Sequence, residues 1–232
     1  MANENEKFWL FDKDKTSFDN IYLSSKKVVE IEQAAVSTPP EEVQLVSDRD
    51  GCNFVIIGRE NPIEIKIHDT DVLRINNRIL KHRLKFPPDL EMRYRIKTTN
   101  GGEPEQLFTM KGNRVIGAGY SRDEAEFDID DLSVAELRIA YQKNLMYKTR
   151  LFVKDGSGWL QFNFYKKPTV SFVMIEREFK TAEEMNNYKL PERYAYLGAI
   201  DMAGANCFGD LMLASNPHLA EAQYAEFKAR VR

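Results

Sequence analysis

Several short segments of the chain alternate charged with apolar residues, and along one face each segment carries charges of a single sign. The cations are Arg93, Arg95, Lys111, Lys148 and Arg150, and the carboxylates are Glu124, Glu126, Glu176 and Glu178. Lysine and arginine bind phosphate oxygens, and arginine does so through two parallel N–H donors. Carboxylates are hard oxygen ligands that suit Mg²⁺ or Mn²⁺. These residue types could therefore hold a phosphate chain together with the metal that assists its cleavage.

The two-residue alternation predicts β-strands, because successive side chains of a strand point to opposite faces. Alternating charge is also typical of the wet face of a half-buried antiparallel sheet, so a plain sandwich is one interpretation. The sorting of charge by strand favours another. The faces opposite the charges carry Tyr94, Phe108, Phe127 and Phe179, which could pack against helices outside. The charged face would then point inward and line a barrel with a polar lumen.

The remaining pattern indicates a chain built mainly of β-strands. Strands are predicted at 28–34, 43–47, 53–58, 62–68, 91–98, 106–111, 123–129, 146–153, 159–165 and 170–179. Helices are predicted to begin at Ser133 and Thr181, each followed three residues later by glutamate, and at Pro217 after Asn216. Trp159 is expected to pack in the core, with its indole N–H bonded.

Composition excludes several other classes of protein. The 232 residues carry a net charge of −3, so nothing global indicates a duplex DNA or membrane-surface partner. Two distant cysteines give no disulfide framework, and no apolar run is long enough for a membrane span. The acidic start of the chain does not resemble a secretory signal. A cytoplasmic protein is expected.

The ordered motifs resemble the CYTH family, also called triphosphate tunnel metalloenzymes. The resemblance covers roughly residues 91–217 and is carried by Arg93-Tyr94-Arg95-Ile96, Leu107-Phe108-Thr109-Met110-Lys111, Arg122-Asp123-Glu124-Ala125-Glu126, Tyr147-Lys148-Thr149-Arg150 and Val173-Met174-Ile175-Glu176-Arg177-Glu178. The segment from Trp159 to Phe164 is similar to the family's tryptophan-led strand.

The resemblance implies an α+β, mainly β fold: an antiparallel, eight-stranded, tunnel-like barrel with helices packed outside. It further implies Mg²⁺- or Mn²⁺-dependent hydrolysis of inorganic triphosphate, a nucleoside triphosphate or an RNA 5′-triphosphate end. The cations named above would bind phosphate, the glutamates would bind metal, and Glu176 and Glu178 would be catalytic. A polyanion-binding or assembly protein without catalysis, and ATP cyclisation, are the alternatives.

The family's first strand carries a Glu-x-Glu-x-Lys motif, and two segments compete for that place. Pro62-Ile63-Glu64-Ile65-Lys66 keeps one glutamate and the lysine, whereas Glu30-Ile31-Glu32 keeps both glutamates. The first is favoured because it lies nearer to Arg93, which makes Glu64 a metal ligand and Lys66 catalytic. Residues 61–217 would then form the barrel, 218–232 a C-terminal helix, and 1–60 an extension or added strand layer.

Overall fold

The computed structural model describes residues 4–116, 120–197, 200–201 and 210–230. Its strands are β1 (Glu4–Asp12), β2 (Lys27–Val36), β3 (Val43–Ser47), β4 (Asn53–Ile57), β5 (Ile63–Ile67), β6 (Glu91–Thr99), β7 (Pro104–Ile116), β8 (Tyr120–Asp128), β9 (Leu145–Asp155), β10 (Gly158–Lys167), β11 (Phe172–Phe179) and β12 (Ile200–Asp201). Its α-helices are α1 (Phe18–Ser24), α2 (Asp69–Arg74), α3 (Asp131–Ala140), α4 (Ala182–Asn187), α5 (Asp210–Ser215) and α6 (Pro217–Arg230). The short helical turns are η1 (Lys13–Lys15), η2 (Pro40–Glu42), η3 (Ile75–Leu80), η4 (Gln142–Asn144) and η5 (Glu192–Leu197).

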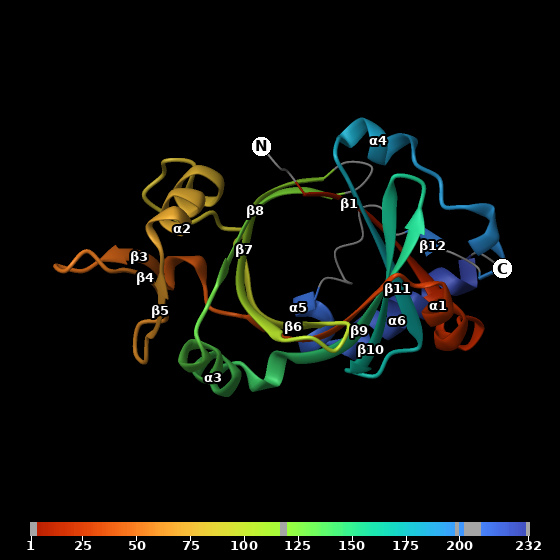
Figure 1. The fold of residues 1–232 in the computed structure, drawn as a ribbon, viewed down its shortest axis with the longest axis horizontal. Coiled ribbons are helices and arrows are strands. Elements are labelled where there is room, and N and C mark those ends of the chain that lie inside the picture. Colours follow the sequence, from red (N-terminus) through yellow and green to blue (C-terminus); the bar gives the residue numbers. More distant parts are fainter. Residues whose placement is uncertain (1–3, 117–119, 198–199, 202–209, 231–232) are drawn as a thin grey trace.

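The larger sheet curls into a barrel. Among the described residues its strand order is β11-β10-β9-β2-β6-β7-β8-β1-β12, and β11 also pairs with β1. This last pairing is antiparallel, runs from Asn5↔Phe179 to Asp12↔Phe172, and closes a ring of eight strands. Figure 1 shows the ring nearly end-on, with β6, β7 and β8 on one side and β10 and β11 on the other. The mainly antiparallel α+β architecture expected from the sequence is confirmed.

The alternation along each strand decides which side chains point into the barrel. On β6, Met92 and Tyr94 are buried in the core outside the ring, while Arg93 and Arg95 line the interior. On the partner strands β7 and β8, Phe108 and Phe127 also join the outer core. The apolar faces of these strands are thus buried outside the ring, and the barrel interior receives the charges.

An insert between β2 and β6 supplies that outer core. Its strands β3, β4 and β5 form a separate three-stranded sheet, followed by α2 and η3, and it lies beside β7 and β8 in Figure 1. Buried Ile65, Ile75 and Ile79 pack in one cluster with Phe108 of β7. The insert is therefore attached to the barrel by apolar packing.

The insert also holds the edge of β8. Strand β8 pairs with β1 only through Tyr120–Arg122. Beyond that point, Arg74 Nη1 donates to the Glu126 carbonyl at 2.5 Å, and Arg78 Nη1 donates to the Glu124 carbonyl at 3.1 Å. Two backbone acceptors that have no strand partner on that side are satisfied in this way.

Helices α5 and α6 pack against residues of the barrel's inner face. Leu213, Ala220 and Tyr224 contact a buried cluster that includes Leu10 and Phe172. A hydrogen bond from Lys228 to Asp12 adds to this contact and lowers the pKa of the Asp12 carboxyl. One end of the barrel is therefore filled with apolar side chains, and the charged cavity occupies the rest.

Several local expectations can be compared with the structure. Helix α4 is capped by Thr181 and α6 begins at Pro217, as predicted. The cap of helix α3 lies three residues earlier than expected, because the Asp130 carboxylate accepts from the Ser133 N–H and takes the capping position expected for Ser133. The expected division at residue 60 falls between β4 and β5, which pair with each other. None of the helices in the described part of the chain has the length and apolarity that crossing a membrane requires.

Candidate functional site: a charged cavity inside the barrel

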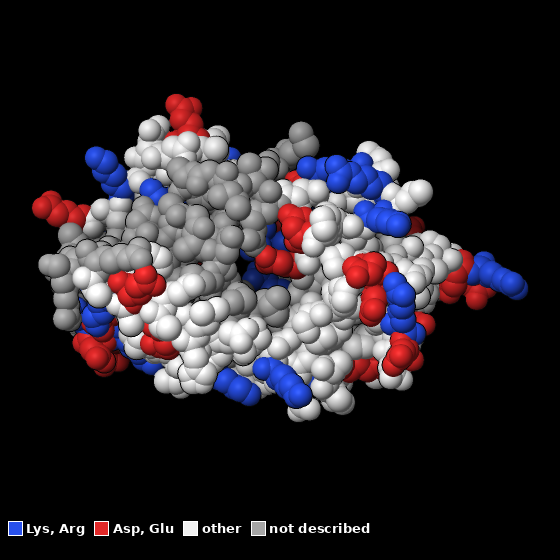
Figure 2. Space-filling model, turned by 180° about the vertical axis from the view of Figure 1, so that it is seen from behind, with Lys and Arg blue, Asp and Glu red and all other residues white. Residues whose placement is uncertain are grey.

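The barrel encloses a cavity of about 1250 Å³ whose lining is dominated by charged side chains. Ten lysines and arginines and seven glutamates line it, so the lining carries a net positive charge while the whole chain carries −3. Figure 2 shows a hollow in the surface with Lys and Arg atoms inside it and Asp and Glu atoms beside them. The local sorting of charge favours an anionic ligand that contacts the lysines and arginines and is accompanied by a cation that contacts the glutamates.

On the β6–β8 side, Glu126 is surrounded by donors. Its carboxylate accepts from Lys97 Nζ at 3.1 Å and from Thr109 Oγ1 at 3.0 Å, and Arg95 Nη1 lies 3.7 Å away. Burial acts to raise the pKa of Glu126, but the charges of Arg95 and Lys97 and the hydrogen bonds outweigh it, so the pKa lies below its usual value. Glu126 is therefore an anion that pairs with one buried cation, Arg95, and one partly buried cation, Lys97.

The cations of this cluster also affect one another. Burial is the largest cause that lowers the pKa of Lys97, and the neighbouring charge of Arg95 lowers it further, against the opposing effect of Glu126. Arg95 itself is only 6% exposed, and its Nε donates to Gln33 Oε1 at 3.2 Å. Burying two cations side by side is costly. A polyanion bound between them would relieve that cost.

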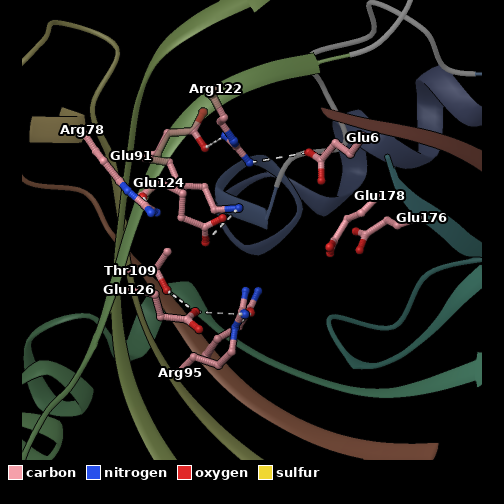
Figure 3. Close-up of polar contacts among 12 residues, drawn as sticks. Glu6, Arg78, Glu91, Arg95, Thr109, Arg122, Glu124, Glu126, Glu176 and Glu178 are labelled. Atoms are coloured by element: carbon pink, nitrogen blue, oxygen red, sulfur yellow. Dashed lines mark hydrogen bonds and ion pairs between the residues drawn. The ribbon is translucent and has the colours of Figure 1, made fainter. Parts of the chain in front are cut away.

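A second group of charges lies along β7, β8 and β1. Lys111 Nζ is 3.4 Å from Glu124 Oε1, while Arg122 Nη1 is 2.7 Å from Glu91 Oε2 and its Nη2 is 3.8 Å from Glu6 Oε1. Figure 3 shows Glu91, Arg122, Glu124 and Glu6 projecting into the same space. Acidic and basic groups therefore alternate around the cavity.

Arg150 on β9 faces them from the other side and is fixed by three acceptors. Its Nε donates to Asn163 Oδ1 at 2.7 Å, its Nη1 to Gln161 Oε1 at 2.6 Å, and its Nη2 to Glu176 Oε2 at 2.5 Å. Gln161 in turn donates to Glu178 Oε1 at 2.9 Å. Neighbouring strands β9, β10 and β11 thus hold a guanidinium and two carboxylates in one network.

Three carboxylates line the cavity where β1 pairs with β11. Glu6 is directly across from Glu178 in the register, and Phe8 is across from Glu176. All three glutamates point into the lumen in Figure 3. Like charges directly opposite each other on adjacent strands are destabilising, so a divalent cation here would offset their repulsion.

These carboxylates have the ligand chemistry that a divalent metal needs, but they are not assembled into a metal site. Carboxylate oxygens are the ligands that Mg²⁺ and Mn²⁺ prefer. Within the described residues, however, no group of three or more His, Cys, Asp or Glu is close enough to hold an ion as it stands. Metal binding by Glu6, Glu176 and Glu178 would therefore require the carboxylates to come closer together, and Glu176 would have to give up part of its contact with Arg150.

The structure brings together most of the expected site residues. Those that line the cavity are Arg93, Arg95, Lys111, Glu124, Glu126, Arg150, Glu176 and Glu178. Lys148 does not line it: the side chain is 1% exposed, and its Nζ lies 5.5 Å from the centroid of the Tyr165 ring.

The expected first strand is corrected by the structure. Glu64 and Lys66 are exposed on β5, which belongs to the three-stranded sheet of the insert and not to the barrel. The predicted alternation is confirmed, since Ile63, Ile65 and Ile67 are buried, but the opposite face of this small sheet faces away from the barrel. The competing segment Glu30–Glu32 is part of barrel strand β2.

The glutamates of β2 nevertheless point away from the cavity. Glu32 binds Arg138 Nη2 of α3 at 2.6 Å, and Glu30 binds Lys166 Nζ at 2.7 Å. The lumen-facing positions of β2 are instead taken by Val29 and Ile31, which line the cavity. Neither Glu64 nor the pair Glu30 and Glu32 therefore supplies the carboxylates expected from the first strand of the barrel.

The missed strand is β1. Glu4-Asn5-Glu6-Lys7-Phe8 contains the spaced glutamates of the family's first motif and has Phe8 at the position of the lysine. Glu6 and Phe8 line the cavity. The signal was present in the two glutamates and the apolar run Phe8–Phe11 behind them. The other missed lining charges include Glu91, Lys97 and Arg122.

Comparison with known proteins finds likeness in structure only. No protein-family model matches the chain, and no curated protein matches its sequence. The crystal structure of the inorganic triphosphatase NE1496 is 15% identical, with 93% of this chain and 97% of that chain covered and a TM-score of 0.48. The putative adenylyl cyclase HpAC1 from Hippeastrum, described as having a dominant triphosphatase activity, is 10% identical, with 90% and 94% covered and a TM-score of 0.49.

A third structure, PH1012 protein from Pyrococcus horikoshii OT3, is 16% identical, with 77% of this chain and 82% of that chain covered and a TM-score of 0.38. Because the identities lie between 10% and 16% and the TM-scores below 0.5, the function has to be inferred from the cavity's own residues.

Proposed function

We propose that the barrel binds a triphosphate in its charged cavity and hydrolyses it with Mg²⁺ or Mn²⁺. The observation that carries this proposal is the arrangement of cations and carboxylates from opposite walls around one cavity of about 1250 Å³. A triphosphate and its metal match such a lining, since the phosphate oxygens need cations and the metal needs carboxylates.

Binding would proceed as an exchange of partners. In the structure, Lys97 is paired with Glu126, Lys111 with Glu124 and Arg150 with Glu176. Phosphate oxygens would take the place of these carboxylates as acceptors for the cations. Because a buried charge without a partner costs on the order of several kcal/mol, the released carboxylates need a cation of their own.

The carboxylates are placed to hold that cation. Glu6, Glu176 and Glu178 would bind it where β1 and β11 meet, and Glu124 and Glu126 are proposed ligands on the opposite wall. A bound Mg²⁺ or Mn²⁺ would polarise the phosphoryl group and lower the pKa of water near it.

In the proposed reaction, a water oxygen attacks the terminal phosphorus and the bridging P–O bond breaks. Glu176 or Glu178 accepts a proton from the water, which is the role of a general base. Arg95, Arg93, Lys111 and Arg150 bind the oxygens on which negative charge develops. The products are orthophosphate and the shortened phosphate chain, and the proton passes to solvent.

A second candidate is a protein that binds the same ligand without turnover. Two observations favour it. Phe8 stands where the family's motif has lysine, and the described carboxylates are not assembled around a metal position. This candidate predicts that triphosphate raises the melting temperature of the protein but is not consumed.

Phosphate release from inorganic triphosphate and from ATP, with Mg²⁺ or Mn²⁺ present, separates the two candidates. Hydrolysis is expected with the wild-type chain, and Glu176→Gln should lower kcat by about 100-fold or more, the effect typical of removing one group that acts on the reacting atoms. Glu64→Gln, an isosteric change on the exposed face of β5, is the matched control and should keep full activity. An active Glu176→Gln variant contradicts the catalytic role, and ligand-dependent stabilisation without phosphate release supports binding alone.

A further inference from the structure

Part of the charged cavity is lined by two aromatic side chains, Trp159 of β10 and Phe152 of β9. Trp159 pairs with Lys154 and Gln161 pairs with Phe152, so these residues share the inner face of the barrel. Each ring is accompanied by a cation. Lys154 Nζ lies 4.6 Å from the centroid of the Trp159 ring, and Lys27 Nζ lies 5.1 Å from that of Phe152.

Core packing does not explain this tryptophan. Trp159 was expected in the core, yet it is 38% exposed and belongs to none of the buried clusters formed by the described residues. The other tryptophan, Trp9, is 3% exposed and buried in a core cluster. A large aromatic ring that faces a charged cavity is typical of a binding site, where it stacks on a planar ligand.

The rings are placed in a definite order relative to the site's charges. Glu176, Gln161, Phe152 and Lys27 form one row across β11, β10, β9 and β2, and Trp159 lies two residues along β10 from that row. In the opposite direction along β10, Asn163 binds Arg150. With a rise of about 3.4 Å per residue, Trp159 and Asn163 lie about 14 Å apart along the strand. A nucleoside triphosphate with its base at Trp159 could reach Arg150 with its phosphates.

We propose that Trp159 and Phe152 bind the planar base of a nucleoside triphosphate whose phosphates occupy the cation-lined part of the cavity. This inference rests on the proposed function and narrows its substrate to triphosphates that carry an aromatic base. Stacking of a base on an aromatic side chain commonly changes affinity by a factor of about 10 or more. Inorganic triphosphate has no group that could use these rings.

The test compares two substrates on the same variants. Trp159→Ala should raise KM for ATP about 10-fold and leave KM for inorganic triphosphate unchanged, whereas Trp159→Phe, which keeps a ring, should fall between wild type and Trp159→Ala for ATP. Phe18→Ala is the matched control, because Phe18 is 39% exposed on α1, packs edge-to-face against Phe164 and does not line the cavity. It should change neither KM.

Binding supplies a readout that needs no turnover. ATP titrated without metal should quench the fluorescence of Trp159, and Trp159→Phe should abolish most of the quenching because Trp9 is buried. Trp159→Ala should weaken ATP binding in calorimetry while binding of inorganic triphosphate stays the same.

The outcomes separate this inference from the proposed function. Absence of hydrolysis with intact ATP binding at Trp159 overturns the catalytic proposal alone and supports the stacking site. Equal loss for ATP and inorganic triphosphate in Trp159→Ala shows a structural role and overturns the inference. Unchanged ATP binding in that variant, or no ATP binding by the wild-type chain, overturns it as well.

Discussion

Strands β5 and β6 have the same alternating pattern, but their polar faces lie in different environments. In β5, isoleucines alternate with Glu64 and Lys66, and in β6, Tyr94 and Ile96 alternate with arginines and Lys97. Both strands turn their apolar faces to one shared core. The polar face of β5 is exposed, whereas that of β6 lines the cavity.

The comparison shows that alternation determines which face of a strand is apolar but not what the polar face meets. Strand β5 is at the edge of an open three-stranded sheet, whereas β6 lies between β2 and β7 in the closed ring. Closure removes the polar face of β6 from bulk water, so each cation there needs nearby acceptors. Arg95 is 6% exposed and has Gln33 and Glu126 beside it.

The largest difference between the two strands should appear in ligand binding. Arg95→Ala removes a charged donor from the cavity and should weaken binding of inorganic triphosphate by about 10- to 100-fold, the range for a hydrogen bond to a charged group. Lys66→Ala removes a cation from exposed β5 and should leave binding unchanged. Titration calorimetry measures the dissociation constant of each variant. Equal effects of the two substitutions would show that β5 and β6 do not differ in ligand binding.

The buried face of β5 should matter for stability even though its polar face does not matter for binding. Ile65 is 0% exposed, and Ile65→Ala should lower the free energy of unfolding by about 2–5 kcal/mol through lost burial and a residual cavity. Lys66→Ala next to it should change that free energy by less than about 0.5 kcal/mol. Urea unfolding monitored by circular dichroism gives both values, and a tolerated alanine at position 65 would argue against the shared core.

A smaller effect concerns acid stability of the cavity wall. Because the pKa of Glu126 is lower in the folded chain than its usual value, ionised Glu126 stabilises the fold above that usual value, and this contribution is lost as the pH falls through the folded pKa. Glu126→Gln should therefore destabilise the protein at neutral pH, and the difference from wild type should shrink on acidification below about pH 4.5.

Glu64→Gln on β5 is the control for that pH series and should follow the wild-type curve. Melting temperatures measured between neutral and acidic pH test the prediction. A Glu126→Gln curve parallel to wild type at every pH would show that the contacts with Lys97 and Arg95 do not stabilise the fold.

Local sequence patterns predicted much of this molecule. Alternation predicted which side chains of β6, β7 and β8 share a face, and the sorting of their charges by strand anticipated the cavity lined by Arg95, Lys111 and Glu126. These strands are joined by short connections, so their pairing depends on nearby residues.

The features that the sequence did not predict depend on pairing between strands that are distant in the chain. Strand β1 was missed because its partner β11 lies more than 160 residues away, with Asn5 opposite Phe179, and only that pairing turns Glu6 into the lumen. The direction of Glu30 and Glu32 depends in the same way on the register of β2 between β6 and β9. Trp159 was expected in the core because its local sequence does not show that its face of β10 lines the cavity, opposite the face on which Leu160 joins the core.

The central claim is that the cations and carboxylates of opposite walls act on one bound triphosphate. The most direct measurement is calorimetric titration of the wild-type chain with inorganic triphosphate, with and without Mn²⁺. One ligand bound per chain, with tighter binding when Mn²⁺ is present, is the predicted result. Absence of binding under both conditions would contradict the account, because the charged side chains would then serve only to form ion pairs with one another.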